Sequence, residues 1–192
     1  KYARNKNVIV IGGSGSGKSE YAEHLVMSSG CPVRYYVATM TVYGEEGKAK
    51  VLRHQELRRG KGFITVECPV NVDTALSGIS SNQEEDAPED AALLLECVSN
   101  LAANEMFADS VEELGNAAIN RLAGKLAGDI LSLAPRVRDM VIVTNEVASD
   151  GITYDPGTDQ YIRLMGLVNR RLGACSHQVV EVVYGIPVVW KG

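Results

Sequence analysis

The sequence lacks the features of several large classes of protein. No apolar run among its 192 residues approaches the length of a membrane-spanning helix, and we expect no signal peptide before the first predicted strand. The chain has 19 Lys and Arg residues against 24 Asp and Glu residues, and its formal net charge is −5. General nucleic-acid binders usually carry a basic surface. We therefore expect no membrane span and no nucleic-acid partner.

Cysteine is scarce, and its spacing excludes the common paired motifs. Cys31, Cys68, Cys97 and Cys175 are scattered and form no C-x-x-C pair. This pattern is typical of reduced, partly buried thiols in a cytoplasmic protein. The chain also has no internal repeat and no inter-domain linker, and its length suits a single domain with a full core. We expect one nucleotide-binding domain over residues 1–192 and a cytoplasmic location.

The strongest signal that is present is a glycine-rich stretch near the N-terminus. The β-branched run 8–11 breaks at Gly12, and Gly17-Lys18-Ser19 leads directly into a helix-forming segment, 20–27. This is the Walker A pattern, G-x-x-x-x-G-K-[ST], between a strand and a helix. Its glycines let backbone N–H groups converge on phosphate oxygens, while Lys18 reaches the β- and γ-phosphates and Ser19 offers its hydroxyl to Mg²⁺. The stretch predicts nucleoside triphosphate binding at Gly12, Gly13, Ser14, Gly15, Ser16, Gly17, Lys18 and Ser19.

Strand and helix patterns alternate along the chain, which is typical of an α/β domain with a mostly parallel sheet. Besides 8–11, strands are predicted at 34–39, 63–67, 91–97 and 140–146, and two terminal strands, 179–183 and 188–190, are joined by a tight turn. After the first helix, further helices are predicted at 44–59, 101–107, 111–133 and 159–174. The acidic segment 80–90 is expected to be a solvated loop.

Polar residues stand where several of these strands are expected to end. They are Thr39, Glu67, Glu96, Asn145 and Glu146. Ligands of such sheets bind beyond the carboxyl ends of the strands. Glu96 ends a fully apolar strand, where a Walker B carboxylate would hold Mg²⁺ directly or through water. The alternative is that Glu96 caps the next helix, a task for which Ser99 and Asn100 are better suited.

A second distinctive stretch is the basic segment that contains His54. Lys50, His54 and Arg58 are spaced four apart, so a helix would place them on one face. Neighbouring cations would keep His54 neutral and nucleophilic and would attract a triphosphate. An exposed histidine on a basic helix explains the spacing equally simply, and spacing alone favours that alternative. His24 and His177 are interpreted as structural.

Together these motifs resemble the bifunctional adenosylcobinamide kinase/adenosylcobinamide-phosphate guanylyltransferase family of cobalamin biosynthesis. The resemblance runs from the first strand to Trp190. Apart from the Walker loop and the valine-rich terminal strands, it rests on six short matches: Tyr36-Val37-Ala38-Thr39, Arg53-His54 with Arg58, Thr65-Val66-Glu67, Leu94-Leu95-Glu96-Cys97 with Ser99-Asn100-Leu101, Val143-Thr144-Asn145-Glu146-Val147, and Asn169-Arg170-Arg171-Leu172.

The resemblance implies a RecA-like P-loop NTPase fold, a mostly parallel sheet flanked by helices with a C-terminal strand pair. It implies that the histidine corresponding to His54 accepts GMP. It further implies that ATP and GTP are substrates, that Mg²⁺ is the metal ion and that adenosylcobinamide is the small-molecule partner. It also implies a homotrimer, for which the apolar-rich stretch 111–133 is available. The implied site comprises His54 and Lys18 as catalytic residues, Ser19 and Glu96 at the metal, and Val37, Ala38, Thr39, Gln55, Arg58, Glu67 and Glu96 at the nucleotide beside the Walker loop.

The chain departs from the family pattern at two places. Gly15 stands where many members carry an arginine, and the segment 148–154 replaces the usual Gly-x-Gly-Ile-Val-Pro. Which residues touch the corrinoid, and the roles of Asn145, Glu146 and Arg170, stay open at this point. Two other functions are compatible with the motifs: a P-loop small-molecule kinase, which needs no nucleophilic His54, and a nucleotide-dependent regulatory ATPase, which would hydrolyse nucleotide independently of any corrinoid.

Overall fold

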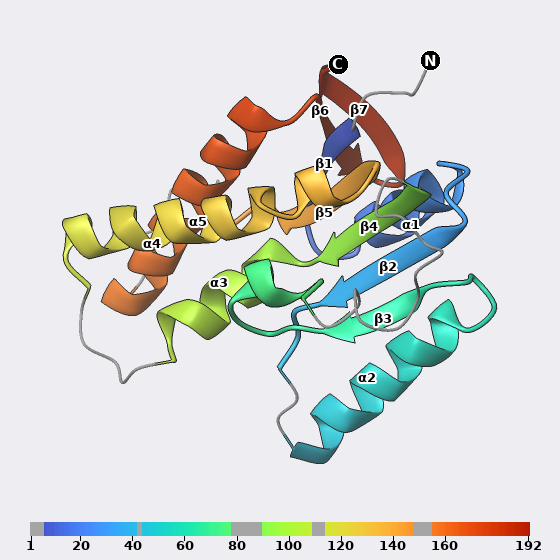
Figure 1. Cartoon of the computed structure of the whole chain (residues 1–192). Coiled ribbons are helices and arrows are strands. Elements are labelled where there is room, and N and C mark those ends of the chain that lie inside the picture. The colour runs from blue at the N-terminus through green and yellow to red at the C-terminus, as the bar shows by residue number, and fades with distance from the viewer. Residues whose placement is uncertain (1–5, 42–43, 78–89, 109–113, 148–154) are drawn as a thin grey trace.

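The computed structural model describes residues 6–41, 44–77, 90–108, 114–147 and 155–192, and its architecture is shown in Figure 1. The side chains of residues 44–46, 50, 53, 54 and 57 are outside this description. The predicted acidic loop, 80–90, falls almost entirely outside the described residues, and so does the segment 148–154 that departs from the family pattern.

One seven-stranded sheet runs through the molecule in the order β3-β2-β4-β5-β1-β6-β7. All its neighbouring strands are parallel except the antiparallel pair β6–β7. Central parallel strands are buried on both faces, which explains why β4 and β5 are continuous apolar runs. The strands span β1 Lys6–Gly12, β2 Val33–Ala38, β3 Ile64–Glu67, β4 Ala91–Glu96, β5 Asp139–Asn145, β6 Gln178–Val183 and β7 Ile186–Lys191.

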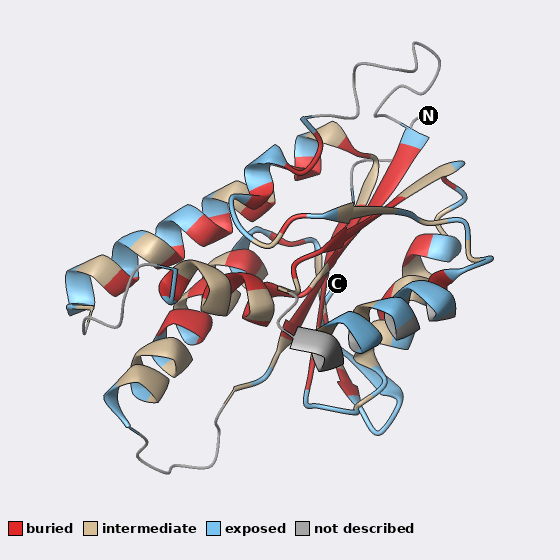
Figure 2. Ribbon diagram, turned by 90° about the horizontal axis from the view of Figure 1, so that it is seen from below, coloured by how far each residue is buried: buried red, intermediate tan, exposed pale blue. Residues whose placement is uncertain are grey.

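Helices cover both faces of the sheet (Figures 1 and 2). On one face Ala22 and Val26 of α1 pack against strand residues such as Val10 and Leu94. On the other face α3, α4 and α5 enclose a larger core around Leu93, Leu95 and Ile142. The helices span α1 Lys18–Met27, α2 Gly44–Arg58, α3 Val98–Met106, α4 Asn116–Leu131 and α5 Pro156–Cys175, with short 3₁₀ turns at Val72–Thr74 and Ala134–Arg136.

Helix α2 differs from the others because most of its described side chains are exposed (Figure 2). Its sequence has weak apolar periodicity, so it has no wide apolar face to bury. Arg58, at the last position of α2, is the only buried side chain among those described in this helix. Among the described side chains of α2, the one that packs into the body of the molecule therefore lies at the C-terminal end of the helix.

Three helices begin three or more residues away from the predicted start. Helix α3 begins at Val98 with Cys97 as its N-cap, so the prediction that Ser99 or Asn100 caps this helix is wrong. Helix α4 begins at Asn116 rather than at residue 111. Helix α5 begins at Pro156, because the carboxylate of Asp155 accepts hydrogen bonds from the backbone N–H groups of Gly157 and Thr158, both at 3.1 Å.

The apolar face of α4 is not available for subunit contacts, contrary to expectation. Its apolar side chains, Ile119, Ala123, Leu126 and Ile130, are buried in the core of their own chain. The exposed apolar side chains lie elsewhere, with Ile186, Val189 and Trp190 of β7 among the largest. No helix within the described residues is both long enough and apolar enough to cross a membrane.

The predicted tight turn between the terminal strands is confirmed. Tyr184 and Gly185 connect β6 to β7 with φ values of 50° and 77°. Two consecutive positive φ values are those of a type I′ turn, whose twist matches that of a hairpin. All four cysteines are free thiols, of which Cys31, Cys68 and Cys97 are buried and Cys175 is exposed.

Candidate functional site

The Walker loop connects β1 to α1 in a conformation that requires glycine at two positions. A Cβ on Gly12 would lie 2.5 Å from Ser16 Oγ and 2.7 Å from the carbonyl oxygen of Val182, so no side chain fits there. Gly17 is the N-cap of α1 with φ 89°, a left-handed conformation that favours glycine. Lys18 Nζ donates to the carbonyl oxygen of Gly13 at 3.0 Å, which folds the lysine back over its own loop.

The C-terminal hairpin holds this loop from the side. The backbone N–H of Gly185 donates to the carbonyl oxygen of Ser16 at 2.8 Å. A Cβ on Gly17 would lie 3.4 Å from the Cα of Gly185, so the loop and the turn are in close contact. The shape of the phosphate loop therefore depends on a turn near the opposite end of the chain.

The polar strand ends meet at one edge of the sheet, as predicted. Ala38, at the end of β2, is in register with Glu67 of β3 on one side and Glu96 of β4 on the other. Gly12, where the Walker loop begins, is in register with Asn145 of β5. The loop and the strand-end carboxylates thus face the same space beyond the sheet.

A cavity of about 230 Å³ occupies this edge of the sheet. It is lined by six residues of the predicted site, namely Lys18, Ser19, Ala38, Arg58, Glu67 and Glu96. Seven further residues complete the lining: Tyr36, Met40, Val51, Cys97, Asn100, Val143 and Asn145. The structure therefore brings the end of the Walker loop, two strand-end carboxylates and the end of α2 to one cavity.

Glu96 is bound through both of its carboxylate oxygens. Ser19 Oγ donates to Oε1, and the hydroxyl of Tyr36 donates to Oε2 at 2.7 Å. These contacts turn the carboxylate toward the loop, so Glu96 does not cap α3. A hydroxyl and a carboxylate in contact are suitable ligands for Mg²⁺, which takes one or two protein oxygens and completes its shell with substrate phosphates and water. No cluster of three or more His, Cys, Asp or Glu among the described residues could hold a metal ion unaided.

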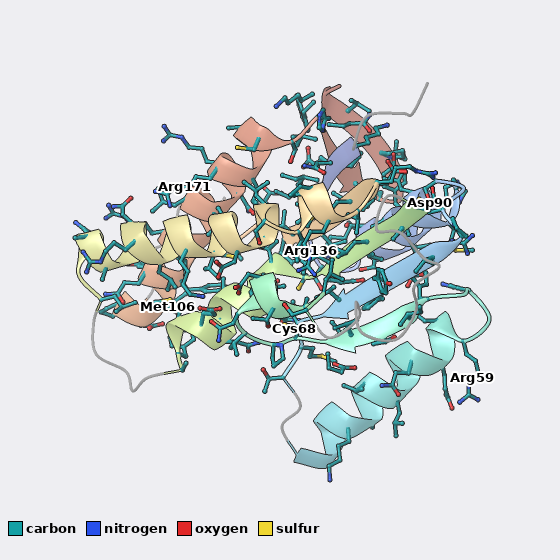
Figure 3. All side chains as sticks on the ribbon, in the orientation of Figure 1. Arg59, Cys68, Asp90, Met106, Arg136 and Arg171 are labelled. Atoms are coloured by element: carbon teal, nitrogen blue, oxygen red, sulfur yellow. The ribbon has the colours of Figure 1, made fainter. Side chains whose placement is uncertain are left out.

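Arg58 is a buried cation at the wall of the cavity. Its side chain is 7% exposed, and its guanidinium carbon lies 3.7 Å from the centroid of the Tyr36 ring. Its Nε has no hydrogen-bond partner among the described residues. A guanidinium stays charged at any physiological pH, and a buried charge needs an opposite charge beside it. The next residue, Arg59, points away from the body of the molecule (Figure 3).

Several predicted site residues do not line the cavity. Val37 is buried in the core on the face of the sheet that α3, α4 and α5 cover. The hydroxyl of Thr39 is bound to the backbone of Cys97. It donates to the carbonyl oxygen and accepts from the N–H, each at 2.7 Å. The side chain of Gln55 is exposed. His54 belongs to α2, one turn before Arg58, and its side chain lies outside the described part of the structure.

Asn145, whose role the sequence left open, lies in the wall of the cavity. Its Nδ2 donates to Ser99 Oγ at 2.6 Å, and its carbonyl oxygen accepts from Asn169 Nδ2 at 3.4 Å. Asn169 also accepts from Thr144 Oγ1 at 2.7 Å, so α5 holds the end of β5 in place. Asn145 Oδ1 is buried without a partner among the described residues. The sequence signals for Asn145 are its place at a strand end and its part in a family motif.

Three further residues, Arg171, His177 and His24, do not line the cavity. Arg171 Nη1 donates to the carbonyl oxygen of Asn120 at 3.1 Å, which joins α5 to α4 well away from the Walker loop (Figure 3). His177 Nδ1 accepts from the N–H of Asn7 at 3.1 Å, in agreement with the structural interpretation of this histidine. His24 is exposed on α1. Tyr36 has no local pattern that indicates a cavity and enters the sequence prediction only as part of a motif. Asn100 enters it only as part of a motif and as a possible helix cap.

The chain is similar to known proteins over nearly its whole length. A family model described as cobinamide kinase / cobinamide phosphate guanyltransferase matches residues 8–190. Two relatives are named bifunctional adenosylcobalamin biosynthesis protein CobU. The one from Salmonella typhimurium is 32% identical over 96% of this chain and 99% of its own length, and the one from Escherichia coli is 28% identical with the same coverage. A third, CobP from Pseudomonas aeruginosa, is 24% identical over 96% of both chains.

Solved structures agree on the fold. A protein from Pyrococcus horikoshii OT3 superposes with a TM-score of 0.55 over 100% of this chain and 89% of its own, at 9% identity. A second solved structure, described as an ATPase domain, gives a TM-score of 0.54 over 94% of this chain and 70% of its own, at 10% identity. At such identities the likeness concerns the fold alone. It confirms the predicted P-loop fold with a mostly parallel sheet and a C-terminal strand pair.

Proposed function

The chain belongs to the cobinamide kinase / cobinamide phosphate guanyltransferase family, and from this premise we propose that it carries out both transfers on a corrinoid substrate. The first is phosphorylation of adenosylcobinamide by ATP or GTP, and the second is transfer of GMP from GTP to the phosphorylated product. The observation that carries the proposal is the cavity at which Lys18 and Ser19 of the Walker loop meet Glu96 and Arg58.

In the first transfer the acceptor is the hydroxyl of the aminopropanol arm of adenosylcobinamide. Its oxygen forms a bond to the γ-phosphorus, the bond from that phosphorus to the β-bridging oxygen breaks, the hydroxyl proton is released and a nucleoside diphosphate departs. The loop amides and Lys18 stabilise the charge on the transferring phosphoryl group. Lys18 must leave the carbonyl oxygen of Gly13 to do so, and that single exposed hydrogen bond is easily exchanged for a phosphate.

In the second transfer a ring nitrogen of His54 attacks the α-phosphorus of GTP. A P–N bond forms and pyrophosphate leaves. A phosphate oxygen of the corrinoid product then attacks the same phosphorus, the P–N bond breaks and adenosylcobinamide-GDP is released. A covalent intermediate divides one difficult transfer into two easier ones. Placement of His54 one turn before Arg58, whose buried guanidinium reaches the cavity, supports this assignment.

Ser19 and Glu96 are the residues that would hold Mg²⁺. When bound, the ion would neutralise charge on the β- and γ-phosphates. Glu96 accepts hydrogen bonds from Ser19 and Tyr36, so its carboxylate is already oriented toward the end of the Walker loop. We further propose that residues 1–192 act as one nucleotide-binding domain, since strands from both ends of the chain belong to the same sheet. The cytoplasmic location stays a prediction.

The proposal is tested by incubating the purified chain with α-labelled GTP and Mg²⁺, followed by denaturing gel analysis. We expect label on the protein that is lost in acid and kept in base, and its transfer to phosphorylated adenosylcobinamide when that acceptor is added. A chain that phosphorylates adenosylcobinamide but never carries the label would be a small-molecule kinase. A chain that hydrolyses nucleotide without any corrinoid dependence would be a regulatory ATPase.

Glu96→Gln is expected to lower the rate of the kinase step at a fixed, subsaturating Mg²⁺ concentration by roughly 10- to 100-fold. The amide has nearly the shape of the carboxylate but no charge, and its NH₂ group cannot accept from Ser19 or Tyr36. The measurement is transfer of γ-labelled phosphate to adenosylcobinamide. Glu56→Gln, on the exposed side of α2, is the control. Equal rates for the two variants would remove Glu96 from the metal site.

Analytical ultracentrifugation is expected to give a mass of three chains of 20.7 kDa each. The family resemblance implies a trimer, and the exposed apolar side chains of β7 would be covered by a neighbouring subunit. Trp190→Ser, which removes a large side chain that is 69% exposed, should weaken the assembly. A wild-type chain that sediments as a monomer at micromolar concentration would overturn the proposal of a trimer.

A further inference from the structure

Tyr36 touches both Glu96 and Arg58 at the cavity. Its hydroxyl donates to Glu96 Oε2 at 2.7 Å, and its ring carries the Arg58 guanidinium at 3.7 Å from the centroid. Tyr36 is almost fully buried, although it forms part of the cavity wall. Tyr36 therefore contacts the acidic group at the Walker loop with one end and the basic group of α2 with its face.

The contacts around Tyr36 fix the end of α2 to the sheet. Phe63 meets the Tyr36 ring edge-on, with centroids 5.9 Å apart and planes at 80°. Arg34 Nη1 donates to the carbonyl oxygen of Lys61 at 3.2 Å, and Lys61 forms an ion pair with Glu23 of α1. The chain from Arg58 to Phe63 thus wraps over Tyr36. The aromatic face holds the guanidinium in place, and Arg58 forms no ion pair with a carboxylate among the described residues.

The hydroxyl of Tyr36 holds one oxygen of the Glu96 carboxylate. It donates to Oε2, which leaves Oε1 directed at Ser19. Core packing alone would need only the ring, so the hydroxyl and the ring can be tested separately.

We propose that Tyr36 is a positioning residue with two separable actions on the nucleotide site. Its hydroxyl orients the Glu96 carboxylate for a divalent cation, and its ring presents the Arg58 guanidinium to an anionic phosphate group. This inference rests on the proposed function, because it takes Mg²⁺ and a nucleoside triphosphate as the ligands of the cavity. In this proposal Tyr36 of β2 links α2, which carries His54, to the Ser19–Glu96 pair.

The test is binding of a fluorescent ATP analogue to the full chain, titrated with Mg²⁺ and repeated in excess chelator. Tyr36→Phe keeps the ring and loses the hydroxyl. It should raise the Mg²⁺ concentration for half-maximal binding by about 10-fold, with unchanged binding in chelator. Tyr36→Leu loses the ring as well, and should also weaken binding in chelator several-fold. Tyr35→Phe removes a hydroxyl from the neighbouring tyrosine on the opposite face of the sheet and should change neither quantity.

Each action has an outcome that overturns it. Tyr36→Phe with an unchanged Mg²⁺ midpoint excludes the role of the hydroxyl, and a lowered unfolding midpoint alone would mark that hydroxyl as merely structural. Binding in chelator that is equal for Tyr36→Phe and Tyr36→Leu excludes the role of the ring. If Tyr36→Leu fails to fold, Arg58→Lys, which keeps the charge but not the planar stacking, must weaken binding in chelator more than Arg59→Lys does.

The readout separates this inference from the proposed function. A chain that binds nucleotide with Mg²⁺ but transfers nothing to a corrinoid would overturn the proposed function, while the binding titrations would still decide the role of Tyr36. A wild-type chain that binds no nucleotide would overturn both.

Discussion

His54→Asn should take up no label from α-labelled GTP and should lose guanylyl transfer, yet it should still phosphorylate adenosylcobinamide at close to the wild-type rate. Asparagine approximates the polarity and reach of imidazole but has no nucleophilic ring nitrogen, so only the covalent step fails. Phosphoryl transfer depends on the loop amides, Lys18 and the Ser19–Glu96 pair, none of which this substitution replaces. The measurement is gel-resolved label in one assay and γ-phosphate transfer in a second.

The chemistry of the label and two matched variants complete this test. A phosphoramidate on a histidine nitrogen is lost in acid and survives base, unlike a phosphate ester on Ser or Thr. His24→Asn, on the exposed side of α1, should label like the wild type. His177→Asn should also label, although loss of the hydrogen bond from Asn7 is expected to lower its stability. Undiminished labelling of His54→Asn would exclude His54 as the nucleophile and direct attention to these other histidines.

Lys18→Ala should lower the rate of the kinase step by roughly 10²–10³-fold or more, the effect of removing one preorganised donor from a developing negative charge. The fold should persist, because Lys18 Nζ contacts only the carbonyl oxygen of Gly13 among the described hydrogen bonds, and that contact is exposed. Transfer of γ-labelled phosphate to adenosylcobinamide measures the loss, and the far-ultraviolet spectrum and the unfolding midpoint report on the fold.

Lys6→Ala is the control for this variant, since Lys6 is an exposed lysine at the start of β1 and far from the loop in the register of the strand. It should keep full activity. A folded Lys18→Ala variant that phosphorylates adenosylcobinamide at the wild-type rate would remove the Walker loop from the mechanism. Loss of structure in that variant would contradict the purely local role given to Lys18.

Much of the fold was predictable because its signals are local. The Walker loop, the apolar strands and the helical segments between them each occupy a few neighbouring residues, and their alternation indicates a parallel sheet. Errors arose where a local signal competes with tertiary contacts. Ser99, for example, has the chemistry of a helix cap, but its hydroxyl accepts from Asn145 Nδ2 and its place is inside α3. Helix α5 begins earlier than predicted because Asp155 caps it and Pro156 takes its first position.

The sequence by itself determined the family, the phosphate-binding loop and the strand ends at which the polar residues stand, because each depends on residue types at short, definite spacings. Only the tertiary structure decided how these residues combine. Ser19 and Tyr36 reach Glu96 across 77 and 60 residues of chain, and Gly185 supports the loop at Ser16 from the C-terminal hairpin. Strand order and register bring such partners together, and strand order depends on contacts between segments that lie far apart in the chain. Arg58 stands out as a buried cation only once α2 is placed against the ring of Tyr36.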